Sequence, residues 1–166
     1  MSKIDFNEKF KEALDAMENS SENVFVTGRA GTGKSTLLDY FRNNTKKEIV
    51  VLAPTGVAAL NVKGKTIHSF FGFRPDITLQ KVKKLAAEDT LIYKKLDAIV
   101  IDEISMVRSD LLDCVDKFLR INGKNNKKPF GGIQMIFIGD LYQLPPVVMG
   151  TEKEIFRKEY ASEYFF

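Results

Sequence analysis

The sequence predicts an α/β domain built on a parallel sheet flanked by helices. Short apolar runs alternate along the chain with amphipathic segments, which is typical of strands joined by crossover helices. The run at 48–53 is apolar almost throughout, as in a parallel strand covered on both faces. Glycine-containing or acidic motifs directly follow four of these runs. Because sites in parallel sheets lie at the carboxyl ends of strands, we expect these motifs to share one edge.

The composition is that of a single globular domain covering residues 1–166. The chain is 44% hydrophobic and 28% charged, and its formal net charge of +3 permits nucleic-acid binding without arguing strongly for it. No apolar run is long enough to span a membrane, and the start of the chain lacks the pattern of a secretory signal. Cys114 is the sole cysteine, which excludes an internal disulfide or a cysteine-based metal site. We therefore expect a reducing, cytoplasmic setting.

Periodicity assigns the elements. Strands are expected at 24–27, 48–53, 96–101 and 133–138. Helices are expected at 6–18, 35–41, from 57 onward, 78–88 and 109–121, with Cys114 as a small core residue in the last of these. Leu79, Val82 and Leu85 should face inward from the helix at 78–88. Residues 64–73 are expected to form a loop rich in aromatic residues.

The strongest motif lies between the first strand and the helix that follows. It matches G-x-x-x-x-G-K-[ST], the phosphate-binding loop. Glycines let backbone N–H groups approach an anion closely, and the helix N-terminus adds positive potential. Lys34 would reach the β- and γ-phosphates, and Ser35 would bind Mg²⁺. The expected nucleotide-binding residues are Gly28, Ala30, Gly31, Thr32, Gly33, Lys34, Ser35 and Thr36. The alternative is a glycine-rich turn that matches by chance, which the flanking strand and helix disfavour.

An acid pair, Asp102 and Glu103, directly follows the third apolar strand. An acid in this position can hold Mg²⁺, and a second acid beside it can deprotonate an attacking water. We therefore assign Asp102, with Ser35, to the metal and Glu103 to general-base catalysis. The alternative is a pair of acids that caps the next helix or ends a strand. An adjacent base favours nucleotide hydrolysis over a kinase reaction.

Four stretches, one of which contains the acid pair, resemble the motifs of one helicase family. They are Gly139-Asp140-Leu141-Tyr142-Gln143-Leu144-Pro145-Pro146-Val147, Ala53-Pro54-Thr55-Gly56-Val57-Ala58-Ala59, Thr66-Ile67-His68-Ser69-Phe70-Phe71-Gly72 and Asp102-Glu103-Ile104-Ser105-Met106. Together with the phosphate loop, they closely resemble the petite-integration-frequency (PIF) family of DNA helicases, in the RecD-like branch of superfamily one. The resemblance runs from about residue 23 to residue 147.

The resemblance implies a RecA-like P-loop NTPase fold and ATP-dependent 5′→3′ translocation on single-stranded DNA. Lys34, Glu103 and Gln143 would be catalytic, with Gln143 contacting the γ-phosphate or the attacking water. Contacts to the single-strand backbone would come from Thr55, Gly56, Thr66 and His68. Backbone contacts of this kind do not read sequence. Phe70, Phe71 and Phe73 would either stack on bases or belong to the core.

Two features depart from the family pattern. The family often has a glutamine-bearing motif that reads adenine, and the stretch from Phe6 to Leu14 contains no glutamine. The chain also stops about twenty residues after Pro146, within what reads as a structural element. We therefore expect the first motor domain of a longer helicase, monomeric and weakly active without the second RecA-like domain. The alternatives are a non-helicase P-loop enzyme, such as a nucleotide kinase, and a catalytically silent nucleic-acid-binding module.

Overall fold

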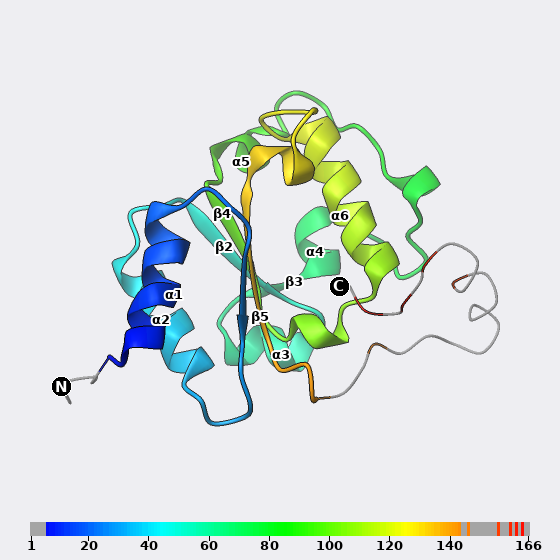
Figure 1. Cartoon of the computed structure of the whole chain (residues 1–166). Helices are drawn as coiled ribbons and strands as arrows, with labels where there is room; N and C mark the ends of the chain where they lie inside the picture. The colour runs from blue at the N-terminus through cyan, green and yellow to red at the C-terminus, as the bar shows by residue number, and fades with distance from the viewer. Residues whose placement is uncertain are drawn as a thin grey trace.

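The computed structural model describes residues 6–143 together with Pro146, Phe156, Tyr160, Ser162 and Tyr164. Within these residues, five parallel strands form one sheet in the order β1-β5-β4-β2-β3 (Figure 1). The strands are β1 (Val24–Thr27), β2 (Ile49–Ala53), β3 (Lys65–Thr66), β4 (Ala98–Ile101) and β5 (Gln134–Gly139). This arrangement confirms the predicted parallel α/β fold.

Strand β5 lies between β1 and β4, and every residue of β4 and β5 is buried. Parallel pairing sets Thr27 opposite Gly139, and Ile101 opposite both Phe137 and Leu52. The carboxyl ends of β1, β5, β4 and β2 therefore reach the same edge of the sheet. The motifs that follow these strands in the sequence are brought together there, as expected.

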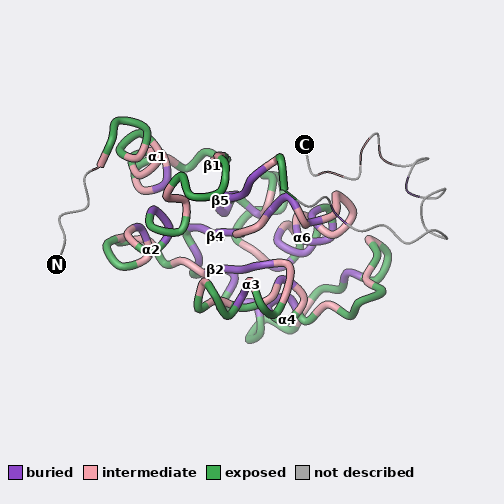
Figure 2. The backbone as a smooth tube through the Cα atoms, turned by 90° about the horizontal axis from the view of Figure 1, so that it is seen from below, coloured by how far each residue is buried: buried purple, intermediate pink, exposed green. Residues whose placement is uncertain are grey.

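Helices cover both faces of the sheet (Figures 1 and 2). Helices α1 (Glu8–Asn19) and α2 (Lys34–Asn44) pack on one face. Helices α4 (Ile67–Phe71), α5 (Leu91–Lys95) and α6 (Ser109–Asn122) pack on the other. The short helix α3 (Gly56–Asn61) follows β2 and contacts β2 and β3. None of the described helices combines the length and apolar character needed to cross a lipid bilayer.

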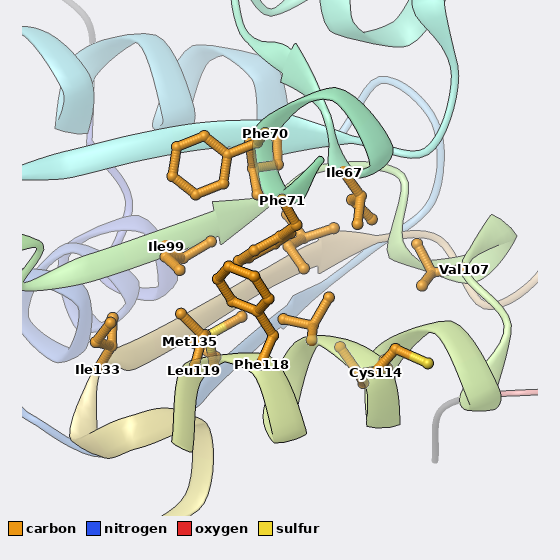
Figure 3. Close-up of a cluster of buried hydrophobic side chains, with 14 of the residues drawn as sticks. Ile67, Phe70, Phe71, Ile99, Val107, Cys114, Phe118, Leu119, Ile133 and Met135 are labelled. Atoms are coloured by element: carbon orange, nitrogen blue, oxygen red, sulfur yellow. The ribbon is translucent and has the colours of Figure 1, made fainter. Parts of the chain in front are cut away.

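Each face of the sheet has its own hydrophobic cluster. The larger cluster joins β4 and β5 to α4, α5 and α6, and Figure 3 shows the rings of Phe71 and Phe118 meeting inside it. Their centroids are 5.2 Å apart, and Phe70 and Phe73 join the same group of aromatic rings. Phe70 and Phe71 are buried, so they belong to the core and offer no stacking surface to a base. Cys114 is buried there too, and burial raises its thiol pKa to about 11, confirming a core residue.

The expected loop at 64–73 is wrong in part, because this segment contains strand β3 and helix α4. Thr66 begins the helix by accepting a hydrogen bond from the backbone N–H of Ser69 at 3.1 Å. Gly72 ends it in the left-handed region at φ 66°. A two-residue strand followed by a five-residue helix is too short to produce a visible period.

The expected helix at 78–88 is also wrong. It is reduced to a single 3₁₀ turn, Leu79–Lys81, followed by an irregular segment. Leu79, Val82 and Leu85 still pack against the larger cluster, as expected. The backbone is held by the buried side chain of Asn122, which accepts from Leu85 N at 2.8 Å and donates to Lys83 O at 3.1 Å. These tertiary hydrogen bonds replace those of a helix, and α5, a helix that the pattern did not predict, begins after the segment.

Candidate functional site

The loop between β1 and α2 has the backbone of an anion-binding cradle. Gly31 and Gly33 adopt φ values of 78° and 91°, a region that favours glycine. The Thr32 hydroxyl donates to the carbonyl of Arg29 at 2.8 Å and tightens the loop. No side chain caps the start of α2. The N–H groups of its first turn therefore remain available to an anion.

Lys34, the first residue of α2, curls back over this loop. Its Nζ donates to the carbonyl oxygen of Gly28 at 2.5 Å and to that of Arg29 at 3.1 Å. The ammonium group thus sits at the mouth of the cradle, where phosphate oxygens can replace the two carbonyls as acceptors. Of the other predicted loop residues, Ala30, Ser35 and Thr36 are exposed.

The two predicted catalytic acids lie at the end of β4, partly withdrawn from solvent. Burial raises the pKa of the Asp102 carboxyl, and the Lys34 charge opposes this rise. Burial also raises the pKa of Glu103, helped by the negative charges of Asp102 and Asp140 and opposed by Lys34. The Lys34 charge thus acts on both Asp102 and Glu103, and the Asp140 charge acts on Glu103. The structure therefore brings the phosphate loop and the acid pair into a single site.

Asp140 is a member of this site that did not appear among the predicted site residues. It follows β5 and is only 5% exposed. Its Oδ1 accepts the N–H of Tyr142 at 3.0 Å, and its carbonyl accepts the N–H of Gln143 at 3.1 Å. The available signal was an acid directly after a buried strand, the same pattern that identified Asp102.

Gln143 is exposed and lies on the turn that Asp140 organises. The ring of Tyr142 on this turn stands 5.8 Å from the guanidinium carbon of Arg29 in the phosphate loop. This cation–π contact shows that the turn borders the phosphate loop. Gln143 thus lies on a turn that borders the phosphate loop, and its catalytic role stays a prediction.

The oxygen donors of this site fit Mg²⁺. Ser35 offers an exposed hydroxyl on the first turn of α2, and Asp102 offers a carboxylate from the end of β4. The described residues contain no group of three acidic, histidine or cysteine side chains that could hold a metal alone. Mg²⁺ characteristically takes one or two protein ligands and completes its shell with phosphates and water. Ser35 and Asp102 are the residues that could supply such ligands.

The predicted DNA contacts gather at the other half of the same edge, after β2 and β3. Thr55 and Thr66 each cap a helix, accepting from Ala58 N at 3.2 Å and Ser69 N at 3.1 Å. Each threonine oxygen accepts in its cap, so the hydroxyl hydrogen can still be donated to a phosphate. Gly56 is exposed at the first position of α3.

His68 lines a cavity of about 520 Å³ whose wall also includes Arg108, Asp110 and Tyr160. Burial lowers the His68 pKa below its ordinary value of 6.5, which favours the neutral imidazole at pH 7. A neutral imidazole binds a phosphate as a hydrogen-bond donor rather than as a charge. The predicted nucleotide residues thus lie after β1, β5 and β4, which we call the nucleotide half, and the predicted DNA contacts lie around the ends of β2 and β3.

Comparison with known proteins identifies one helicase family. The model of the PIF1-like helicase family matches residues 4–164. The ATP-dependent DNA helicase PIF1 of Emericella nidulans is 40% identical over 157 residues, which cover 87% of this chain and 21% of that protein. The Pif1 helicase of Bdellovibrio bacteriovorus is 38% identical, over 91% of this chain and 35% of its own length.

Solved structures give the same result. The crystal structure of Pif1 helicase from Bacteroides in complex with ADP-AlF3 and single-stranded DNA superposes with a TM-score of 0.88 at 39% identity. The match covers 98% of this chain and 38% of that one. The chain thus spans well under half the length of these relatives.

Proposed function

Since the chain belongs to the PIF1-like helicase family, we propose that it is the ATP-binding first motor domain of a 5′→3′ DNA helicase that translocates on single-stranded DNA. The observation that carries this proposal is the convergence of the phosphate loop, the acid pair and the Gln143 turn on three neighbouring strand ends. Such a site is equipped to hold a triphosphate and to direct water at it.

In this proposal the chain's own groups divide the work of hydrolysis. The phosphate loop and Lys34 bind the β- and γ-phosphates, and Gln143 orients the attacking water. Glu103 takes a proton from that water. The water oxygen bonds to the γ-phosphorus, and the bond between the γ-phosphorus and the oxygen that leaves with ADP breaks. Mg²⁺ held by Ser35 and Asp102 would neutralise charge that develops on the phosphate oxygens.

The environment of Glu103 suits a general base. A base works best when its pKa lies near the operating pH, and burial together with Asp102 and Asp140 shifts Glu103 upward from 4.5 in that direction. The Lys34 charge opposes this rise in the Glu103 pKa.

Single-stranded DNA is the proposed polymer substrate. Thr55, Gly56, Thr66 and His68 would contact its backbone through hydroxyl, N–H and imidazole donors without reading bases. The nucleotide half and the predicted DNA contacts share one edge of the sheet. Because β4 pairs with β2, a shift of the backbone after β4 can displace the backbone after β2. The Bacteroides Pif1 structure was solved with single-stranded DNA and a nucleotide complex together, which supports this pairing of ligands.

The proposed domain is one half of a motor. In the family, a second RecA-like domain supplies an arginine that reaches the γ-phosphate. Such arginines are worth about 10³–10⁵ in rate. We infer that this chain acts as a monomer that binds nucleotide well and hydrolyses it slowly.

The test is a pair of titrations on the 166-residue chain. A fluorescent ATP analogue should bind the wild type in the presence of Mg²⁺. Lys34→Ala should weaken this binding at least about tenfold, because the positive charge facing the phosphates is lost. A labelled oligodeoxythymidylate should bind with an affinity that changes when a non-hydrolysable ATP analogue is added.

Other outcomes would replace the proposal. DNA binding with no nucleotide binding would identify a silent nucleic-acid-binding module. Transfer of the γ-phosphate to a nucleotide acceptor, in place of release as inorganic phosphate, would identify a kinase.

A further inference from the structure

The turn between β4 and α6 holds a buried hydroxyl group that has no hydrogen-bond partner among the described residues. Ser105 lies in the 3₁₀ turn Ile104–Met106 and is 1% exposed. Its Oγ is the one buried side-chain oxygen or nitrogen left unpaired in the described part of the chain. Unpaired buried hydroxyls are unfavourable and uncommon in native proteins. Folding alone therefore does not account for a serine at this position.

A second unfavourable feature lies two residues earlier. Glu103 adopts φ 51° and ψ 42°, in the left-handed region that residues other than glycine seldom occupy. Backbone strain of this kind persists at active sites and switch regions. The turn that begins at the proposed base thus contains both backbone strain and an unpaired hydroxyl.

The turn rests directly on the end of β5. A Cβ added to Gly139 would lie 2.9 Å from Ile104 Cγ2 and 3.4 Å from Ser105 N. The two segments therefore pack so closely that only glycine fits at position 139 without a shift of its neighbours. Asp140 follows at once and holds the backbone N–H groups of Tyr142 and Gln143. A shift of the turn at 103–106 therefore displaces Gly139 and, with it, the turn at 140–143.

We propose that Ser105 is a positioning residue that reports the γ-phosphate to Gln143. When a nucleoside triphosphate is bound, the turn at 103–106 shifts and the Ser105 hydroxyl donates to an acceptor of the turn at 140–143. The new hydrogen bond of the Ser105 hydroxyl and the relief of backbone strain at Glu103 then favour the triphosphate-bound arrangement. This inference rests on the proposed ATP site. A diphosphate lacks the group that reaches Glu103 and Gln143, so it leaves the turn unshifted.

The test compares Ser105→Ala with the wild type in calorimetric titrations of a non-hydrolysable ATP analogue and of ADP, both with Mg²⁺. Affinity for the analogue should fall about 5- to 10-fold, the size of a modest coupling between sites. Affinity for ADP should stay within about twofold, and the thermal midpoint of the nucleotide-free protein should not fall, since no bond is lost there.

Ser109→Ala is the matched control. Ser109 lies four positions along the chain and donates to the carbonyls of Ser162 and Tyr164 at 3.0 and 2.6 Å. Its loss should lower the thermal midpoint and leave the ratio of analogue to ADP affinity unchanged. The two serines thus separate a positioning role from a structural one.

The other outcomes overturn the inference. Equal weakening of both nucleotides, an unchanged affinity for the analogue, or a Ser105→Ala protein that is less stable or unfolded would each show a merely structural or inert hydroxyl. A wild type that binds neither nucleotide would instead refute the proposed function. Failure of the proposed function is thus distinguished from failure of the inference about Ser105, because it is seen in the wild type alone.

Discussion

Glu103 lies in an environment that disfavours its charged form, and its chemistry follows from that environment. Burial is the main cause of its raised pKa, and the neighbouring carboxyl groups add to it. Glu103→Gln keeps the shape of the side chain and removes its ability to take a proton. We expect unchanged affinity for an ATP analogue and a fall in turnover of about 10²–10⁴, the usual worth of a general base.

The measurement is phosphate release at saturating ATP, beside an equilibrium titration of the analogue. Glu88→Gln, an exposed change of the same kind, is the control and should leave both quantities alone. Normal turnover by Glu103→Gln would remove Glu103 from the proposed mechanism.

The same residue predicts how stability depends on pH. Its folded pKa lies above the ordinary value of 4.5, so the folded protein holds this proton more tightly than the unfolded chain. The stability that this contributes is full below the ordinary pKa and is lost as pH rises through the folded pKa. Glu103→Gln cannot titrate, so its free energy of unfolding relative to the wild type should increase between a pH below 4.5 and neutral pH. Denaturant titrations at both pH values test this, and a constant difference between the two proteins would contradict it.

At the scale of elements, the irregular segment after Lys81 shows where tertiary contacts override pattern. Asn122 on α6 satisfies two backbone groups of that segment, Leu85 N and Lys83 O. Asn122→Ala leaves both groups without this partner in a partly buried position. We expect a loss of about 1–3 kcal/mol in the free energy of unfolding, measured by chemical denaturation.

Asn125→Ala makes the comparison specific. Asn125 accepts from Lys127 N at 2.9 Å at an exposed position, so its loss should cost less than about 0.5 kcal/mol. Equal effects of the two substitutions would mean that the segment is not held by Asn122.

At the scale of the whole molecule, the sequence predicts the strands and helices correctly where apolar runs or helical periodicity match the buried positions. The strands at 24–27 and 96–101 and the long helix with Cys114 were found because they are apolar or strongly periodic. Helix α4 is too short, at under two periods, for a pattern to predict it. The apolar spacing of the segment at 78–88 predicts a helix wrongly, because the same spacing also suits an irregular chain that packs against α6.

Within the site, the phosphate loop, the acid pair and Gln143 were assigned from motifs, and the structure brings them together. Asp140 stands in the same motif as Gln143 and directly after a strand, but its burial and its effect on the Glu103 pKa are visible only in the structure. The unpaired hydroxyl of Ser105 depends on three-dimensional packing against Gly139, which no spacing in the sequence encodes.

The sheet order yields a last prediction, about the chain as a motor. All the proposed catalytic groups follow β1, β5 and β4 at one edge of the sheet. A family arginine would have to come from the opposite side of a cleft, on a second domain. The 166-residue chain should therefore hydrolyse ATP slowly, with little stimulation by single-stranded DNA.

Fusing the chain to the second motor domain of a PIF1-like relative should raise its DNA-stimulated turnover by about 10³–10⁵, the range attributed to such an arginine. Phosphate release with and without oligodeoxythymidylate measures both proteins. The same fusion with that arginine changed to alanine is the control, and it should return turnover to the level of the isolated chain. Brisk DNA-stimulated hydrolysis by the isolated monomer would show that the γ-phosphate is activated from within this domain alone.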